Sequence, residues 1–521
     1  MARNFSLPAD YWTRVTITAQ DVEFLQGHLF EIETPLTTHD LAAVFVRYRI
    51  KAERDLQSKQ HQAGGKTYLP NGNYSIGEEL VFPALDWAGG RVDAVRSGVN
   101  PELGPFSVIT VGMRDGTQRL FASAFSAHAL NQEESASGDE EDLNLDSVVE
   151  GHGGELEEKL QSSFEKDPAL VKIAGRWFPR GLLVDVNQGH LNLAEAVLDM
   201  AQGEPQPPSA LLKDVELPQG VNLKLAEFSL NYALQEDGRF DEVGPAGEVL
   251  WCLRRLEPEG VREVPLFLRY SPIEYDRSVL DEGLKQLETQ LDDELSEPDG
   301  EEPRDIKEIT ISLIYPHLRA GTLPLSSRAR GLFPTAYESP RVRFTLEDAK
   351  SGVKMPAWVV REHRYVFGLR EWYKSHQLIP GSLVMVRRGK KPGEVIVEAK
   401  TQRSSKDWIR TLMVGADGGM VFAMLKQPIT AEFNDRMVIY VPDFSALDPL
   451  WAKKGSFEEL VASVMREITK LNPQGHVHAQ ELYAAVNLVR RVPPAPLFAL
   501  LMSKDRFVHV GDMHFRLQEE K

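Results

Sequence analysis

The chain has 521 residues and a formal net charge of -18, with 42% hydrophobic and 26% charged residues. These values are typical of globular proteins, and the length predicts several domains that each bury a core. The single cysteine, Cys252, excludes a disulfide framework and a thiolate metal cage. No apolar run is long enough to span a membrane and the N-terminus lacks a signal-peptide pattern, so we expect a cytoplasmic protein with no membrane partner.

Two segments carry the whole of the negative charge. Residues 133–166 contain 12 acidic and 2 basic residues, and residues 276–308 contain 13 acidic and 4 basic ones. Acidic tracts of this kind are usually solvated spacers, and less often they compete with nucleic acid for a basic face. We therefore predict acidic linkers over 131–167 and 276–308.

The N-terminal region, residues 1–130, is predicted to combine two helices with a small β-barrel. Thr18 and Thr38 are placed to cap helices with apolar stripes, and the second helix has a basic outer surface. A helix, a short turn and a basic helix outline a helix-turn-helix. The turn dipeptides and alternating runs after residue 65 favour an SH3-like barrel with a structural or partner-binding role.

Two later regions, 168–275 and 451–521, share one pattern of helices, a Phe, a Val-Gly pair and a hydrophobic strand. The Phe and Val residues are Phe240 and Val243 in the first copy and Phe507 and Val510 in the second. A pattern that recurs within one chain is stronger evidence than either copy alone. Both copies resemble the HARE-type winged-helix family, which includes the delta subunit of bacterial RNA polymerase and domains fused to restriction enzymes. The resemblance implies winged-helix domains that contact either DNA or protein.

The region 309–450 contains a basic module. Residues 321–410 hold 18 Lys and Arg against 8 Asp and Glu, a balance of +10 inside an acidic chain. Short alternating runs between Gly, Pro and Lys turns predict a β-barrel with added strands and one short helix around Trp372. A basic surface of this kind is what contact with phosphate requires. The alternative is a solvated barrel exterior that is basic without binding a ligand.

The order of residues in this module resembles the B3-type pseudobarrel DNA-binding domain of plant transcription factors. A relative of that fold is the target-reading domain of some bacterial restriction endonucleases. The matching places are Leu323-Pro324, the loop 326–331, Trp358, Trp372 and the strand 383–386. Glu371 and Ser382 depart from the family pattern, which has Gly and Asp there. The resemblance implies two loops that grip the major groove as arms.

The candidate DNA contacts lie in the two arms and in one further turn. They are Ser327, Arg328 and Arg330 in the first arm, Arg361, His363 and Arg364 in the second arm, and Lys390 and Lys391 in the turn. Arginine suits both phosphate contact and bidentate reading of guanine.

Motifs for catalysis are missing from the sequence, which has no P-loop, no dinucleotide-binding loop and no G-x-S-x-G elbow. Glu398-Ala399-Lys400 is similar to the end of a nuclease motif, but no suitable Asp precedes it. His476 and His478 lack a third metal ligand nearby. We therefore predict no cofactor, no metal and no enzymatic activity, with nuclease activity left open.

Together these features predict an α+β multidomain chain of winged-helix and helix-turn-helix modules with small β-barrels, including a B3-like pseudobarrel. The expected function is non-enzymatic binding of double-stranded DNA, in transcription regulation or DNA-based defence. The alternative is a protein-interaction scaffold or an RNA polymerase-associated factor that uses winged helices and acidic tracts. Either function allows a protein partner such as RNA polymerase or a defence-system nuclease.

Overall fold

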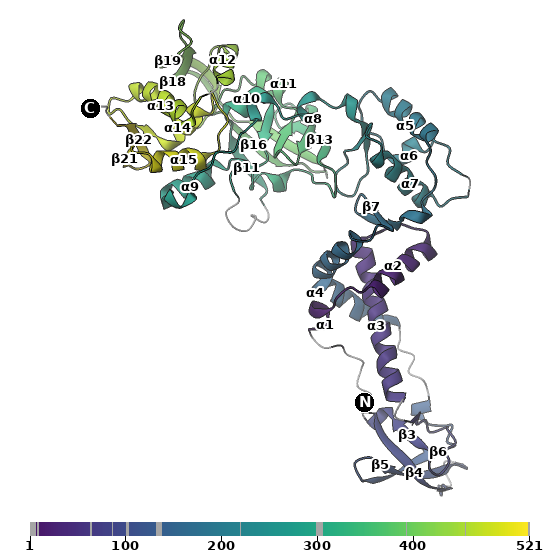
Figure 1. The fold of residues 1–521 in the computed structure, drawn as a ribbon. Coiled ribbons are helices and arrows are strands. Elements are labelled where there is room, and N and C mark those ends of the chain that lie inside the picture. The colour runs from purple at the N-terminus through teal and green to yellow at the C-terminus, as the bar shows by residue number, and fades with distance from the viewer. Residues whose placement is uncertain are drawn as a thin grey trace. The chain divides into compact units, whose positions relative to one another are not determined.

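The computed structural model describes most of the chain (Figure 1). The described residues are 7, 10–62, 65–85, 87–100, 104–131, 138–218, 220–297, 306–391, 393–453 and 455–518. Helices and several separate sheets occur along them, which confirms the predicted α+β class. The chain divides into two compact units, Met1–Leu183 with Gly220–Phe228, and Val184–Gln219 with Ser229–Lys521. Among the described helices, none combines the length and apolar character that crossing a bilayer requires.

In the first unit, helices carry a small antiparallel sheet. The elements are α1 (Tyr11–Arg14), α2 (Ala19–Ile32), β1 (Leu36–Thr37), α3 (Thr38–Gln62), α4 (Gly138–Phe164), β7 (Leu170–Ile173) and β8 (Arg176–Pro179). Thr18 caps α2 as predicted, and Asp21 completes a capping box. The sheet order is β1-β8-β7. Strands β7 and β8 fall within the region 168–275, which is predicted to be a separate domain. In the structure, β8 pairs with β1, which lies between α2 and α3.

The predicted acidic linker 131–167 contains α4. This helix packs against α3, and it buries Leu156, Leu160 and Phe164 at i, i+4 and i+8. Its apolar stripe therefore belongs to a helical core, while its acidic residues account for the charge of the segment.

A second sheet is inserted between α3 and α4. Its strands are β2 (Lys66–Thr67), β3 (Glu79–Phe82), β4 (Ala88–Ser97), β5 (Ser107–Met113) and β6 (Gln118–Ser123), in this order across the sheet. Tyr68, Phe82 and Ile109 are buried in its core. The sheet lies where the sequence predicts a small barrel.

The second unit begins with a compact helical module. Its elements are α5 (Gln188–Met200), α6 (Pro208–Leu211), α7 (Leu223–Glu236, whose first residues belong to the first unit), β9 (Phe240–Glu242) and β10 (Trp251–Leu253). Gln206 forms an isolated β-bridge with Trp251, so one residue extends the β9–β10 sheet next to β10. The buried Trp251 ring donates its indole N–H to Asn231 Oδ1 at 2.7 Å. Cys252 is buried in β10.

A curled seven-stranded sheet follows, and it is the predicted basic module. Its elements are β11 (Glu308–Ser312), α10 (Tyr315–Ala320), β12 (Thr322–Pro324), β13 (Arg341–Asp348), β14 (Lys354–Val360), β15 (Tyr365–Phe367), α11 (Arg370–Ser375), β16 (Leu383–Arg388) and β17 (Glu394–Ala399). The order is β11-β16-β17-β13-β14-β15-β12, antiparallel except for β13 and β17. Gly321 ends α10 at φ 73, where an added Cβ would lie 2.6 Å from Arg370 Cβ.

The C-terminal part contains a long hairpin and a second helical module. The elements are β18 (Thr401–Val414), β19 (Met420–Ala431), α12 (Asp448–Ala452), α13 (Phe457–Ile468), β20 (Val477–His478), α14 (Ala479–Val486), α15 (Pro494–Ser503), β21 (Phe507–Gly511) and β22 (His514–Leu517). The module's sheet order is β20-β22-β21. The chain between the two modules also contains α8 (Glu259–Arg262) and α9 (Glu282–Leu291). Helix α15 is apolar on nearly all sides, and α9 packs against it (Figure 1).

Helix α9 lies within the predicted acidic linker 276–308, and the turn that follows it is deeply buried. Asp293 and Glu294 meet the guanidinium group of Arg491, and all three residues are at most 6% exposed. Arg491 donates to Asp293 Oδ1 at 2.6 Å, to Asp293 Oδ2 at 2.8 Å and to Glu294 Oε1 at 2.7 Å. Tyr483 adds a hydroxyl bond to Asp293, and His317 lies 3.1 Å from Glu294. These contacts join α9, α10 and the C-terminal module.

The charges in this cluster depend on one another. Burial alone raises the pKa of the Glu294 carboxyl, but Arg491 and His317 outweigh burial and hold that pKa well below its usual range. Removing one charge therefore leaves the others buried without a partner.

Arg491→Ala should lower the free energy of unfolding by about 3–5 kcal/mol, because it leaves two buried carboxylates without their cation. Urea unfolding of the full chain measures the change. Lys470→Ala is the control, since Lys470 forms an exposed ion pair with Glu467 and should cost about 1 kcal/mol or less. Equal losses in the two variants would contradict the importance of the buried cluster.

Candidate nucleic-acid interface

The two predicted arms leave the sheet side by side. Strand β12 pairs with β15, so that Pro324 lies opposite Tyr365. One step further along, the backbone N–H of Leu325 donates to the carbonyl oxygen of Arg364 at 2.8 Å. The first arm follows β12 and the second precedes β15. Because these strands are antiparallel, both arms lie at the same end of the strand pair.

The first arm turns sharply after Leu325. Ser326 is buried, and its hydroxyl accepts the backbone N–H of Ala329 at 3.2 Å. This local bond shapes the arm in the manner of an ST turn. Ser327 is half-buried, whereas Arg328 and Arg330 are exposed. The structure thus presents both arginines of the first arm to solvent.

The second arm is a short loop with one left-handed residue. Arg364 has a φ of 53, and its side chain is exposed and donates to the carbonyl oxygen of Glu294 at 3.1 Å. His363 is exposed and stacks over Tyr365 with ring centres 6.5 Å apart. Arg361 is half-buried and donates to the carbonyl oxygen of Ser339 at 2.7 Å. A guanidinium group has five donors, so each of these bonds leaves others for a ligand.

The lysine turn lies close to the first arm. Lys390 and Lys391 are exposed between β16 and β17. At the end of β16, Arg388 donates from Nε and Nη2 to the carbonyl oxygen of Gly331, at 3.1 and 2.5 Å. Sequence reasoning missed Arg388 and its exposed neighbour Arg387, although two arginines before Gly-Lys-Lys are a visible signal.

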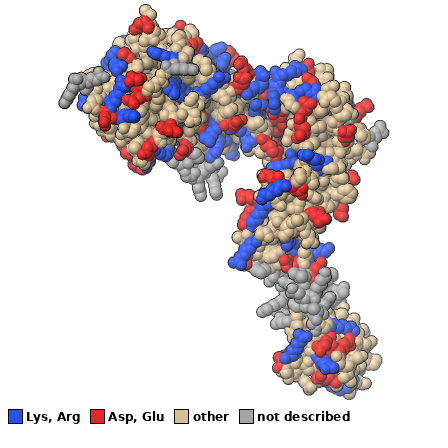
Figure 2. All heavy atoms as spheres, in the orientation of Figure 1, with Lys and Arg blue, Asp and Glu red and all other residues tan. Residues whose placement is uncertain are grey.

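These exposed basic side chains form one group, which we call the arm rim. The arm rim consists of Arg328, Arg330, His363, Arg364, Arg387, Arg388, Lys390 and Lys391. Over the part of the molecule that holds β13 and β16, Figure 2 shows basic side chains interspersed with acidic ones and no continuous basic face on the side drawn. A duplex contact here would therefore depend on projecting loops more than on a broad field.

A different side of the sheet is covered by the first helical module of the second unit. Val243, Val261 and Leu268 pack with Trp358, Val360 and Tyr365 in one buried cluster. The backbone N–H of Arg343 donates to the carbonyl oxygen of Val243 at 2.8 Å. Protein therefore occupies this side of β14 and β15, whereas the residues of the arm rim are exposed.

Two buried acidic residues, Asp241 and Glu257, lie beside this apolar cluster. Arg341 bonds to Asp241 and lies 3.3 Å from Glu257 Oε2. Burial and, to a smaller extent, Asp241 raise the pKa of Glu257 to about 8, although Arg341 acts in the opposite direction. Burial likewise raises the pKa of Glu242 to about 7.

Glu257→Gln should weaken the pH dependence of stability. A carboxyl group with a raised pKa stabilises the fold while protonated, so its contribution is complete below pH 4.5 and is lost as the pH rises towards 8. The free energy of unfolding should fall between about pH 5 and pH 8 in the parent, and fall less in the variant, because the amide cannot ionise. Urea unfolding across this range measures both. Glu259→Gln, at an exposed neighbour, should follow the parent; identical pH profiles for all three proteins would contradict the assignment.

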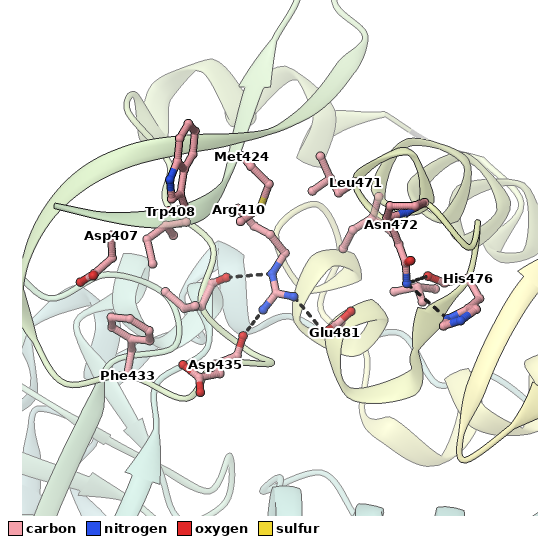
Figure 3. A pocket seen from close by; sticks show the side chains of 15 residues that line it. Asp407, Trp408, Arg410, Met424, Phe433, Asp435, Leu471, Asn472, His476 and Glu481 are labelled. Carbon is pink, nitrogen blue, oxygen red and sulfur yellow. Dashed lines mark hydrogen bonds and ion pairs between the residues drawn. The ribbon is translucent and has the colours of Figure 1, made fainter.

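A pocket of about 640 Å³ lies between the β18–β19 hairpin and the C-terminal module (Figure 3). Arg410 crosses it, donating to the carbonyl oxygens of Asp435 and Val438 and pairing with Glu481 at 2.9 Å. Trp408 stands at the rim and is 61% exposed. Figure 3 shows these three contacts of Arg410, which therefore acts as a cross-link between the hairpin and the module.

Histidines gather next to this pocket. The His514 ring lies 4.7 Å from the His476 ring and 5.0 Å from the His478 ring, centre to centre. Burial, with Arg436 and His514, lowers the pKa of His478 to about 4. Within the described residues, no group of three His, Cys, Asp or Glu side chains is placed to hold a metal ion.

A comparison of the chain with protein-family models, curated proteins and solved structures finds no match. The resemblances to the B3 and HARE families therefore remain predictions from the sequence. The function has to be argued from the arm rim and from the modules around it.

Proposed function

We propose that this chain is a non-enzymatic, multidomain protein that binds double-stranded DNA through the arm rim. The observation that carries the proposal is the bond between Leu325 N–H and the Arg364 carbonyl, which holds the two cationic loops together. Arginine and lysine side chains on two adjoining loops and a nearby turn suit the phosphates of one duplex segment. The exposed arginines can also reach guanine edges in the major groove.

The seven-stranded curled sheet supports a B3-like pseudobarrel as the scaffold for this site. Both proposed arms emerge at one edge, and α11 stands at the position expected for the helix around Trp372. Trp372 is buried and anchors that helix in the core of the sheet. A rigid sheet beneath two loops is a common way to position binding residues.

We further propose that the helical modules are winged helices. In the first unit and in the C-terminal module, the order is helix, strand, helix, helix, strand, strand, and the third strand lies in the middle of the sheet. The module around β9 and β10 has the same order, with Gln206 in the place of the first strand. Transcription regulation and DNA-based defence both remain compatible with such a set of modules.

The third helices of two of these modules, α4 and α15, favour protein over DNA as their ligand. Helix α4 contains nine acidic residues and one basic residue, which would repel phosphate. Helix α15 is covered by α9 and by its own module. This observation supports the second candidate function, a protein-interaction scaffold whose partner could be RNA polymerase or a defence-system nuclease.

Replacing Arg328 by Ala together with Arg364 by Asn should weaken duplex binding. Asn is chosen at 364 because it tolerates the left-handed φ. A base-reading Arg should cost about 1–3 kcal/mol and relax sequence preference, whereas Lys390→Ala with Lys391→Ala should weaken all sequences alike and lower the salt slope by about 1 per lost phosphate contact. Fluorescence anisotropy with labelled duplexes at about 50 and 200 mM salt measures both effects.

Lys470→Ala is the control, because Lys470 lies in the C-terminal module outside the arm rim and should leave duplex binding unchanged. If the full chain shows no salt-dependent duplex binding, the scaffold function replaces the DNA-binding one. If the double arginine variant binds as the parent does while the lysine pair proves essential, the two-arm docking is wrong.

A further inference from the structure

The turn that follows α9 touches both proposed arms. Asp292 accepts the hydroxyl hydrogen of Ser326 at Oδ2, 2.6 Å away, and that of Ser327 at Oδ1, 3.2 Å away. Two residues later, the carbonyl oxygen of Glu294 accepts a bond from Arg364. One short acidic stretch therefore engages a hydroxyl pair on the first arm and the guanidinium group of the second arm.

The same turn is held firmly from its other side. Asp293 and Glu294 form the buried cluster with Arg491, which is 1% exposed. The Tyr483 hydroxyl donates to Asp293 at 2.5 Å. Asp292 itself adopts the left-handed conformation at the end of α9, with a φ of 47. The backbone of the turn is thus shaped and anchored so that its first carboxylate faces the first arm.

A carboxylate and a phosphate group make similar demands on their partners. Each offers anionic oxygens that accept bonds from serine hydroxyls and from guanidinium groups. An anion tethered within the same chain also has a high effective concentration at its site. Asp292 therefore has the chemistry and the position to occupy an anion site that a phosphate of the duplex backbone would use.

We propose that the turn 292–294 is an internal substitute for DNA phosphate, and that a duplex engages the arms fully only after this turn has moved away. The inference rests on the proposed DNA-binding function. It makes Ser326 and Ser327 phosphate ligands, and it makes the C-terminal module a regulator, because Arg491 and Tyr483 hold the turn in place. A partner that loosens the C-terminal module would raise the affinity for DNA.

Asp292→Asn tests the proposal in the full chain. Asn tolerates the left-handed φ but removes the charge and one strong acceptor, so the turn should release the arm without disturbing α9. A labelled 20-base-pair duplex should bind this variant about fivefold or more tightly than the parent. Tyr483→Phe, which removes only the hydroxyl bond to Asp293, should raise the affinity in the same direction by loosening the anchor.

Asp276→Asn is the matched control, because it makes the same change in net charge within the same acidic segment. Asp276 caps a short 3-10 helix (Arg277–Val279), its pKa is lowered by bonds to Ser278, and no bond from the arms to it is recorded among the described residues. Its duplex affinity should stay within about twofold of the parent, since a single exposed charge has a small screened effect. Equal gains in Asp292→Asn and Asp276→Asn would overturn the proposal and leave a general charge effect.

Amide hydrogen exchange separates a failure of this inference from a failure of the proposed function. The N–H groups of Leu295 and Ser296 bond to Asp293 and report on the turn. If their exchange speeds up in Tyr483→Phe while duplex affinity stays at the parent value, and arm variants still weaken binding, the turn does not compete with DNA. If no variant binds the duplex although the turn is loosened, the proposed DNA-binding function is wrong, and so is the role of the serines as phosphate ligands.

Discussion

The buried bond between Arg491 and the carboxylates of Asp293 and Glu294 is the interaction on which the second unit depends most. Three charged groups leave water there, and each is tolerable only because the others are present at hydrogen-bonding distance. The cost of separating them fixes the turn after α9 against the segment between α14 and α15, and the same turn bonds to the loops of the seven-stranded sheet. A stretch that would otherwise be solvated thereby becomes part of the core.

This constraint changes how the charge of the chain should be understood. A net charge of -18 argues against nucleic acid only if the acidic residues are free in solution. In the second unit, some of the acidic side chains bond to other protein groups: Asp293 to Arg491, Glu288 to Arg277, and Asp292 to the first arm. The acidic segment and the basic loops are therefore in direct contact, because the turn after α9 bonds to Ser326, Ser327 and Arg364.

The seven-stranded sheet has two kinds of neighbour, and the contrast between them bears on the proposed placement of the DNA contact. On one side an apolar cluster around Trp358 and Tyr365 joins it to the preceding helical module, with the ion pair between Arg341 and Asp241 at the margin. In the two arms and at Arg388, the side chains bond to backbone carbonyls and to the Asp292 carboxylate. Apolar burial of the first kind is durable, whereas a few polar contacts at a loop can exchange for those of a ligand. This difference supports the proposal that DNA binds at the arm rim, where contacts can be exchanged at low cost.

Local rules were enough to predict much of this protein from its sequence. The cap at Thr18, the alternating burial of β13, the turn glycines and the positions of the arms follow from neighbours a few residues apart. The arms are predicted from the resemblance to the B3 family, and the absence of an apolar pattern in their arginine-bearing loops agrees with an exposed position. Their adjacency, however, comes from the pairing of β12 with β15, across more than forty residues.

Tertiary structure alone decided the rest. Composition could not show that Asp293 and Glu294 are buried, because the cation that stabilises them, Arg491, lies almost two hundred residues away. Nor could it show that β1 pairs with β8 across an inserted sheet, since a two-residue strand has no periodicity to detect. Local propensity determines which elements form, whereas long-range pairing of charges and strand edges determines which of them share a core, and that pairing leaves no mark on the neighbouring residues.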